Sequence, residues 1–329
     1  MGADVKATSP QFSVVIACLD AEGVIAGQLA ALARQGCPVP WEVIVCDNGS
    51  RDGTVALAES WTDRLPLRTV DASEIRGSGP ARNVGVKAAR GEWIGFCDAD
   101  DEVGDRWVAC LCDALAKHSF VTGPFEDERL NSLRTARSRR VDDGTHPLIL
   151  RPGIGLPHAG AGNLGVHRSA FEAVGGFDPQ VRFLQDTDLS WRLQLAGHPL
   201  VFVPELIVHV RLRSTLRGTY RQGHNFGAAQ AGLERRYARI TSQATGIGVP
   251  PGDVGGPDDE CGPTTAPDQG GDKLDAPSGA DLQAPAPAPR RGWQSARSAA
   301  RLVRWFLSRR SSIGEQAWQI GWHIGHRVG

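Results

Sequence analysis

The regular alternation of strand-like and helix-like patterns over residues 12 to about 232 constrains the fold most strongly. Residues 12–19 form a continuous apolar run, which is typical of a strand buried on both faces. Residues 21–34 follow with apolar side chains on one helical stripe. The pattern then continues with expected strands at 41–46 and 93–97 and expected helices at 54–61, 80–90 and 105–118. This alternation predicts an α/β fold with a mainly parallel sheet flanked by helices, in which ligands bind at the carboxyl ends of the strands.

Composition separates this region, taken as a domain at 10–245, from the rest of the chain. Residues 246–289 contain nine Gly and nine Pro but no aromatic residue. From residue 251 to 289 there are eight acidic residues and one Lys. Such a segment buries too little apolar surface to offset its chain entropy, so it is predicted to be a disordered acidic linker.

Residues 290–329 have the opposite charge, with eight Arg and one Glu. Arginines alternate there with apolar side chains, including Trp residues, which predicts a basic amphipathic helical tail. A basic helix with Trp on its apolar side is typical of a membrane-surface helix. Docking of this tail on the domain at 10–245 or on a partner would need the same amphipathicity, so both interpretations stay open.

The overall charge is nearly balanced, with 36 Lys and Arg against 37 Asp and Glu. A protein that binds nucleic acid over its whole surface carries a clear basic excess, so nucleic acid is not expected as a partner. The seven Cys lack C-x-x-C spacing, which favours reduced thiols in a cytosolic protein. No signal peptide or apolar run of about 18 residues is recognised, so we expect a cytoplasmic protein, peripheral at most at the inner face of the cell membrane.

The string CDADD at residues 97–101 directly follows an apolar strand. Three carboxylates at the end of a buried strand repel one another and lose hydration unless a positive group joins them. A divalent cation would do so, and oxygen ligands suit Mg²⁺ or Mn²⁺. A cluster that caps the next helix explains the same string equally well.

Three further strings carry polar residues at turns. VIVCDNGSRDGT at 43–54 ends a strand in Asp47, whose carboxylate could accept a hydrogen bond from a nucleotide base, although a turn and cap need no ligand. GSGPARNVG at 77–85 places Arg82 near a helix start, which is an anion site in principle. Residues 160–197 include a Gly175-Gly176 turn and QDTDL, in which one aspartate can cap a helix and the other can act as a general base.

In this order and spacing the four strings resemble glycosyltransferase family 2, over roughly residues 13–230. The resemblance implies a Rossmann-like nucleotide-diphospho-sugar transferase fold, the A-type glycosyltransferase fold, with a mainly parallel mixed sheet. It further implies a nucleotide-diphosphate sugar donor, an acceptor hydroxyl, and Mn²⁺ or Mg²⁺ as cofactor. Membrane-surface contact through the basic tail would favour a glycan or lipid-linked acceptor of the cell envelope, because the tail would bring the active site to such a substrate.

The resemblance also assigns roles to individual residues of this sequence. Asp186 matches the catalytic base, and Gln185 stands where the family usually has Glu, which puts the acceptor-orienting role of that position in doubt. Asp100 and His209 match the metal ligands. Nucleotide-sugar contacts are expected from Ala17, Leu19, Asp20, Asp47, Arg82, Asn83, Asp98 and Ala99. Acceptor-side roles are expected for Asn163, Gln185, Asp188 and Trp191.

The expected activity is therefore that of an inverting glycosyltransferase. The long motif and the transmembrane helices of the processive synthases are absent, so a non-processive enzyme is favoured. A nucleotidyltransferase would usually carry a basic loop after the first strand, and ACLDAEG at 17–23 has no basic residue. A catalytically silent binding or scaffold module remains the alternative from another functional class.

Overall fold

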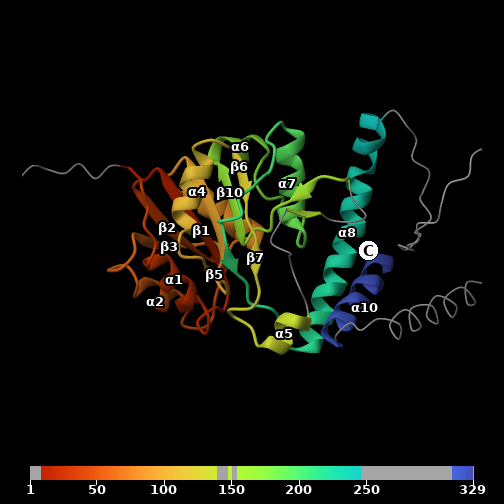
Figure 1. Ribbon diagram of the computed structural model, residues 1–329, viewed down its shortest axis with the longest axis horizontal. Coiled ribbons are helices and arrows are strands. Elements are labelled where there is room, and N and C mark those ends of the chain that lie inside the picture. Colours follow the sequence, from red (N-terminus) through yellow and green to blue (C-terminus); the bar gives the residue numbers. More distant parts are fainter. Residues whose placement is uncertain (1–8, 139–146, 150–153, 246–312, 329) are drawn as a thin grey trace, which may run out of the picture. The chain divides into compact units, whose positions relative to one another are not determined.

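A seven-stranded mixed sheet forms the centre of the computed structural model (Figure 1). Its strand order is β11-β6-β10-β4-β1-β2-β3. β1 pairs in parallel with both β2 and β4, whereas β10 runs antiparallel to β4 and β6. The strands are β1 (Phe12–Cys18), β2 (Trp41–Asp47), β3 (Leu67–Asp71), β4 (Trp93–Asp98), β6 (Phe120–Thr122), β10 (Asn163–His167) and β11 (Val201–Phe202). The mainly parallel sheet expected from the sequence is confirmed.

Helices cover both faces of this sheet, because its central strands are apolar on both sides. Val14 and Ile16 of β1 pack into one core cluster, and Val15 between them packs into the other. The first cluster includes residues of α1 (Ile25–Ala33), α2 (Thr54–Glu59) and α4 (Trp107–Leu115). The second includes residues of α3 (Ser78–Ala88), α6 (Arg168–Ala173) and α7 (Gln185–Leu195).

The register of the strands brings their carboxyl ends to one edge of the sheet. Cys18 at the end of β1 pairs with Asp47 at the end of β2, and Ala17 pairs with Asp98 at the end of β4. Two short sheets complete the fold: β5 (Glu102–Val103), β12 (Val208–His209) and β7 (Phe125–Glu126) form one, and β8 (Leu148–Ile149) and β9 (Pro157–His158) the other. The edge at the ends of β1 and β4 is where the polar strings of the sequence meet.

Two long helices lie together beyond the sheet: α8 (Leu216–Thr245) and α10 (Ile313–Val328), the latter close to α5 (Leu133–Ser138) (Figure 1). Their backbones touch through glycines, because a Cβ on Gly227 would overlap the carbonyl oxygen of Trp322. A Cβ on Gly325 would likewise overlap the carbonyl oxygen of His224. The part of the tail that forms α10 therefore docks on α8, within the compact unit that contains the sheet. Docking within the chain is one of the two arrangements that the sequence left open.

Side-chain contacts complete this helix pair. The indole Nε1 of Trp322 donates to Oε1 of Gln230 at 3.2 Å, and Nε2 of His326 lies 3.1 Å from Oε2 of Glu234. In the chain's division into compact units, residues 311–329 belong with residues 1–241. α10 is thus part of the same unit as the sheet.

The structure describes residues 9–138, 147–149, 154–245 and 313–328. The predicted acidic linker at 246–289 and the first part of the predicted tail lie outside these residues. Among the described helices, none is both long enough and apolar enough to cross a membrane.

Candidate active site

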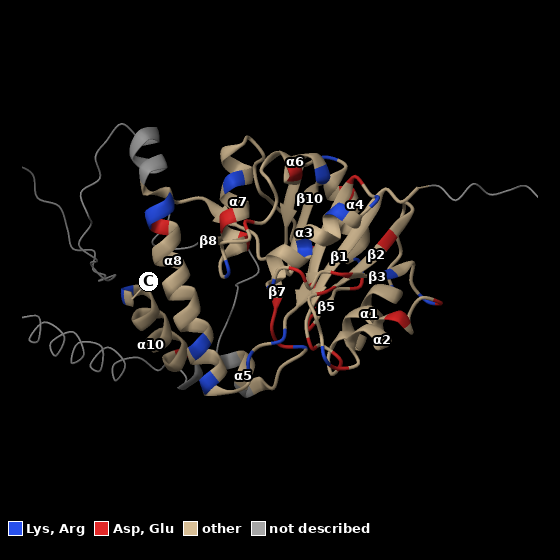
Figure 2. Cartoon of the chain, turned by 180° about the vertical axis from the view of Figure 1, so that it is seen from behind, with Lys and Arg blue, Asp and Glu red and all other residues tan. Residues whose placement is uncertain are grey.

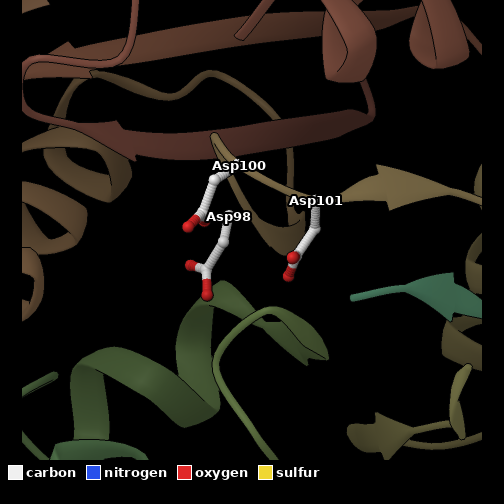
Figure 3. Close-up of side chains that lie close together, drawn as sticks. All are labelled: Asp98, Asp100 and Asp101. Carbon is white, nitrogen blue, oxygen red and sulfur yellow. The ribbon is translucent and has the colours of Figure 1, made fainter. Parts of the chain in front are cut away.

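Three aspartates gather at the end of β4 (Figure 3). Asp98 is the last residue of the strand, and Asp100 and Asp101 follow in the turn before β5. Each offers a carboxylate oxygen, and these oxygens lie within 4.8 Å of one another. Such a set of oxygen donors suits a divalent cation such as Mn²⁺ or Mg²⁺.

The electrostatics of this cluster fit a cation as well. Asp101 is only 4% exposed, and its Oδ1 accepts a hydrogen bond from the backbone N–H of Arg211 at 2.8 Å. Burial, with the charges of Asp98 and Asp100, raises the pKa of Asp101 to about 8. Burial and the charge of Asp98 also raise the pKa of Asp100. The nearby arginines Arg211 and Arg213 thus do not fully offset burial and mutual repulsion, and a bound cation would supply further positive charge.

Arg82 of α3 reaches the cluster from the other side. Its Nη2 donates to Oδ1 of Asp98 at 2.5 Å, while the guanidinium lies 5.5 Å from the ring centre of Phe177. The side chain is 4% exposed, yet its Nε and Nη1 have no hydrogen-bond partner among the described residues. Because buried N–H groups without a partner are costly, Arg82 is prepared to bind an anion.

Two cavities meet at Arg82. The smaller, of about 500 Å³, lies over the ends of β1 and β4 and is lined by Leu19, Asp20, Asp100 and Arg211, among others. The larger, of about 760 Å³, extends toward α7 and α8. Both cavities share the lining residues Ser78, Arg82, Asp98 and Arg213. A ligand in one cavity can therefore touch a ligand in the other.

Asp186 lines the larger cavity from the first turn of α7. Leu184, just before the helix, has a left-handed backbone with a φ of 56°, which turns the chain sharply into α7. Oδ2 of Asp186 accepts a hydrogen bond from the backbone N–H of Ala161 at 3.2 Å, and Oδ1 accepts one from that of Thr187 at 2.9 Å. The neighbouring Gln185 donates from Nε2 to Oγ of Ser78 at 2.5 Å. The carboxylate is thus held in a fixed orientation at the cavity wall.

Most of the donor-side residues expected from the sequence come together. Those lining the smaller cavity are Ala17, Leu19, Asp20, Arg82, Asp98, Ala99 and Asp100. Asp186 and Gln185 line the larger cavity together with Arg82 and Asp98. Residues far apart in the sequence thus surround one continuous space.

Two expected donor contacts lie outside both cavities. The carboxylate of Asp47 accepts hydrogen bonds from the backbone N–H groups of Gly49 and Ser50, the latter at 3.1 Å, and so stabilises its own turn. Asn83 exchanges two hydrogen bonds with the backbone of Phe177, at 2.7 and 2.9 Å, and so fixes the turn at Gly175 and Gly176. Backbone groups engage both side chains, within the same turn for Asp47 and 94 residues along the chain for Asn83.

The expected acceptor-side residues other than Gln185 lie in the interior. Asn163 is fully buried, donates to the carbonyl groups of Pro124 and Leu206 and accepts from Trp107. Asp188 is fully buried, and its carboxylate binds Arg192 at 2.8 Å and the hydroxyl of Tyr237 at 2.9 Å. Trp191 is fully buried as well and donates to the carbonyl oxygen of Leu156. None of the three lines either cavity.

The structure does not bring His209 into the aspartate cluster. Its Nδ1 lies 2.5 Å from Oε2 of Glu126, and its Nε2 lies 3.1 Å from Nη1 of Arg129. Both ring nitrogens are therefore engaged, one by Glu126 of β7 and the other by Arg129 of the segment that follows β7. Asp101 takes the third place in the cluster instead.

Three cavity arginines, Arg182, Arg211 and Arg213, were not expected from the sequence, whereas Arg221 belongs to a basic segment on α8 that the sequence does show. Arg211 and Arg213 are two residues apart in an extended segment after β12, a spacing that places both on one side. Arg182 lies in the loop before α7 and Arg221 on α8, and both line the larger cavity. The spacing of Arg211 and Arg213 was a usable signal. Nothing local in the sequence marks Arg182.

A known protein family matches the part of the chain that contains β1 to β10. The model of the family described as Glycosyl transferase family 2 matches residues 13–175. The chain carries a glycosyl transferase family 2 domain. All of the donor-side residues above lie within this span, whereas Asp186 and the arginines of the larger cavity, Arg182, Arg213 and Arg221, follow it.

Curated relatives match this chain over part of their length. A glycosyltransferase of Bacillus subtilis, YfnE, is 35% identical over 106 residues, which is 32% of this chain and 25% of the relative. The Staphylococcus aureus poly(ribitol-phosphate) beta-N-acetylglucosaminyltransferase TarS is 36% identical over 134 residues, 40% of this chain and 22% of TarS. The matches thus span about a quarter of each relative.

A solved structure extends the likeness to the fold of the whole chain. A mannosyltransferase from Pyrobaculum calidifontis superposes with a TM-score of 0.59 at 18% identity. The superposition covers 97% of this chain and 87% of the mannosyltransferase. The chain has the A-type glycosyltransferase fold that the sequence resemblance implied, so that expectation is confirmed.

Proposed function

We propose that the protein is an inverting, non-processive glycosyltransferase that moves a sugar from a nucleotide-diphosphate donor to an acceptor hydroxyl. The observation that carries this proposal is the junction of the two cavities. One cavity contains the aspartate cluster and Arg82, and the other contains Asp186. The sugar's anomeric carbon would lie at the residues that both cavities share.

The donor nucleotide and its diphosphate belong in the smaller cavity. Asp98, Asp100 and Asp101 would hold Mn²⁺ or Mg²⁺, which supplies positive charge beside the departing diphosphate. The free N–H groups of Arg82 would bind a phosphate oxygen. In line with this, the Pyrobaculum calidifontis mannosyltransferase was solved with GDP-Man and Mn²⁺.

Asp186 would take the proton from the acceptor hydroxyl in the larger cavity. The N–H groups of Ala161 and Thr187 hold its carboxylate, so its free lone pairs keep a fixed direction. The hydroxyl then attacks the anomeric carbon from the face opposite the nucleotide. A single displacement of this kind inverts the anomeric configuration.

A glycan or lipid-linked acceptor of the cell envelope is part of the proposal, since TarS is named for transfer to poly(ribitol-phosphate). We further propose that residues 10–245 form the catalytic domain, that 246–289 form an acidic linker and that the tail at 290–329 contacts a membrane surface from the cytoplasmic side. Within that tail, Trp322 binds Gln230 of α8, so a lipid contact would rest on other residues.

Replacing Asp186 with Asn tests the assignment of the base. Loss of a general base lowers turnover by roughly 10²- to 10⁴-fold while the nearly isosteric amide leaves donor binding in place. Sugar transfer and donor affinity are measured with Mn²⁺ across UDP-, dTDP- and GDP-sugars, with Asp113→Asn on the exposed side of α4 as control. Unchanged turnover in Asp186→Asn would contradict the assignment. Absence of binding by every donor would favour the silent scaffold.

A further inference from the structure

The larger cavity carries two arginines that do not line the smaller cavity, where the donor is proposed to bind. Arg182 comes from the loop before α7 and Arg221 from α8, and both line the larger cavity but not the smaller one. Both side chains are exposed, and the described residues offer neither of them an ion pair or a hydrogen bond. They are therefore free to bind a ligand that enters from the acceptor side.

The wall of α8 has the spacing of a single helical face. Its lining residues are Gly218, Arg221, Gln222, Asn225 and Phe226, which recur at intervals of three and four. Figure 2 shows Lys and Arg at several points along α8, while acidic residues gather on the loops beside β7 and β5. The cavity thus has an acidic end at the sheet and a basic, amide-bearing wall at α8.

The charges of the cavity do not cancel at that basic wall. The acidic residues that line the cavity are Asp98, Asp101 and Asp186. Asp98 is paired with Arg82, and both Asp98 and Asp101 belong to the aspartate cluster that would hold the cation. Arg182 and Arg221 keep their charge without a carboxylate of their own. A guanidinium in that state favours a planar anion such as a carboxylate or a phosphate.

We propose that the acceptor is acidic, with a phosphate or a carboxylate that Arg182 and Arg221 bind beside the attacking hydroxyl. This inference rests on the proposed function, because it names the substrate class of the same site. Phe183, which is 40% exposed and lines the same cavity, offers an apolar ring for a sugar face. The acceptor site would thus bind both the ring and the charge of an acidic glycan.

Binding of matched trimers to the full chain tests the proposal. The probes are fluorescent trimers of glycerol phosphate and of glucuronic acid, with neutral maltotriose as their counterpart. Charge-assisted contacts predict that at least one acidic trimer binds roughly tenfold more tightly than maltotriose at low salt. Arg182→Gln and Arg221→Gln should each weaken that binding by roughly three- to tenfold. Arg217→Gln, one turn earlier on α8 and outside the cavity lining, is the matched control.

The same titrations are repeated with Mn²⁺ and a saturating nucleoside diphosphate. An acidic trimer that stays bound occupies the acceptor side, whereas displacement by the nucleotide places it at the donor site and overturns the proposal. Equal affinity for acidic and neutral trimers, or equal effects of Arg182→Gln and Arg217→Gln, would overturn it as well. Binding of UDP-glucuronic acid to the same variants is measured as well. If Arg182→Gln and Arg221→Gln weaken the binding of UDP-glucuronic acid but not that of the acidic trimers, the anion is on the donor sugar and the proposal is wrong.

These experiments distinguish failure of the acidic-acceptor proposal from failure of the proposed glycosyltransferase function. If nucleoside diphosphates bind but acidic trimers do not, the donor site stands and the acidic acceptor is excluded. If trimers bind through Arg182 and Arg221 but no nucleotide binds in any titration, the anion site stands and glycosyl transfer is excluded.

Discussion

The side chain of Asp101 has two opposing effects: it destabilises the metal-free fold, and it favours binding of a cation. Its carboxyl is 4% exposed beside two other carboxyls, so its ionised form destabilises the metal-free fold. The same feature makes it a good cation ligand, because a bound cation removes the repulsion. Residues that favour a ligand at the expense of stability are common at functional sites.

Asp101→Asn should therefore stabilise the metal-free protein by about 1–2 kcal/mol at neutral pH. The amide oxygen can still accept the hydrogen bond from Arg211. The raised pKa of about 8 means that the folded carboxyl resists ionisation that the unfolded chain undergoes near pH 4. The wild type consequently loses stability as pH rises from about 4 to about 8, and the gain from the substitution grows over that window.

Thermal unfolding with a chelator, at several pH values, measures this difference. Addition of Mn²⁺ should raise Tm in the wild type and much less in Asp101→Asn, since binding to the native state alone is stabilising. A Mn²⁺ response of equal size in both proteins would remove Asp101 from the cation site.

The helix α8 has two faces with different contacts. One face lines the larger cavity through Arg221 and Asn225, and another contacts α10 through Gly223 and Gly227. Small residues let two helix backbones approach closely, and here Gly321 and Gly325 of α10 provide the matching positions. Glycine, which weakens an isolated helix, is thus required where the two helices touch.

The same substitution at two glycines of α8 should have opposite effects. Gly227→Ala places a Cβ against the backbone of Trp322, which cannot rotate away, and should destabilise the protein by about 1–3 kcal/mol. Gly232→Ala meets only the end of the Arg235 side chain, 4.0 Å away, and should be neutral or stabilising by up to about 1 kcal/mol. Denaturant unfolding of both variants tests this. Equal effects would show that α8 and α10 do not pack closely in solution.

The tail at 290–329 divides into an earlier part that contains most of its arginines and a later part that forms α10. Residues 313–328 form α10 in the same compact unit as the sheet, whereas the arginines from 290 to 310 lie outside the described residues. Seven of the eight tail arginines belong to that earlier part. Attraction to an anionic lipid surface is worth roughly 1 kcal/mol per basic residue, so this part carries the electrostatic prediction.

We expect the full chain to sediment with anionic lipid vesicles and not with neutral ones. Replacing Arg297, Arg301 and Arg304 together with Gln should lower the bound fraction several-fold while leaving α10 and its contacts intact. Raised salt should weaken wild-type binding, because exposed charges are screened. Equal sedimentation of the wild type and the triple variant would rule out a lipid contact through these arginines.

Sequence patterns predicted the central strands of the sheet more accurately than the order and direction of its outer strands. The central strands β1, β2 and β4 lie within one residue of their expected bounds, because a strand buried on both faces must be apolar throughout. The antiparallel insertion of β10 between β4 and β6 was not foreseen, since neither strand direction nor strand order is written in a local pattern. The aspartates at the end of β4 were located correctly for the same reason as the strand itself.

Side-chain roles were harder to foresee than side-chain positions. Asp47 and Asn83 carry the expected residue types, yet nearby backbone N–H and carbonyl groups satisfy them. Arg182 carries no recognisable motif, yet folding brings it to the same cavity as Arg221 of the basic segment on α8. Local sequence cannot report which partner a polar group finds across the fold.

Sequence patterns alone predict the α/β class and the ends of the central strands, and they also locate the acidic string after β4 and the QDTDL turn. These follow from apolar periodicity and from turn chemistry, which act over a few neighbouring residues. Only the tertiary structure decided that Arg82 joins the two cavities, that Asp101 completes the aspartate cluster and that α10 docks on α8. Those outcomes depend on contacts between residues 16 to more than 100 positions apart, and their energies come from burial and charge in the assembled fold.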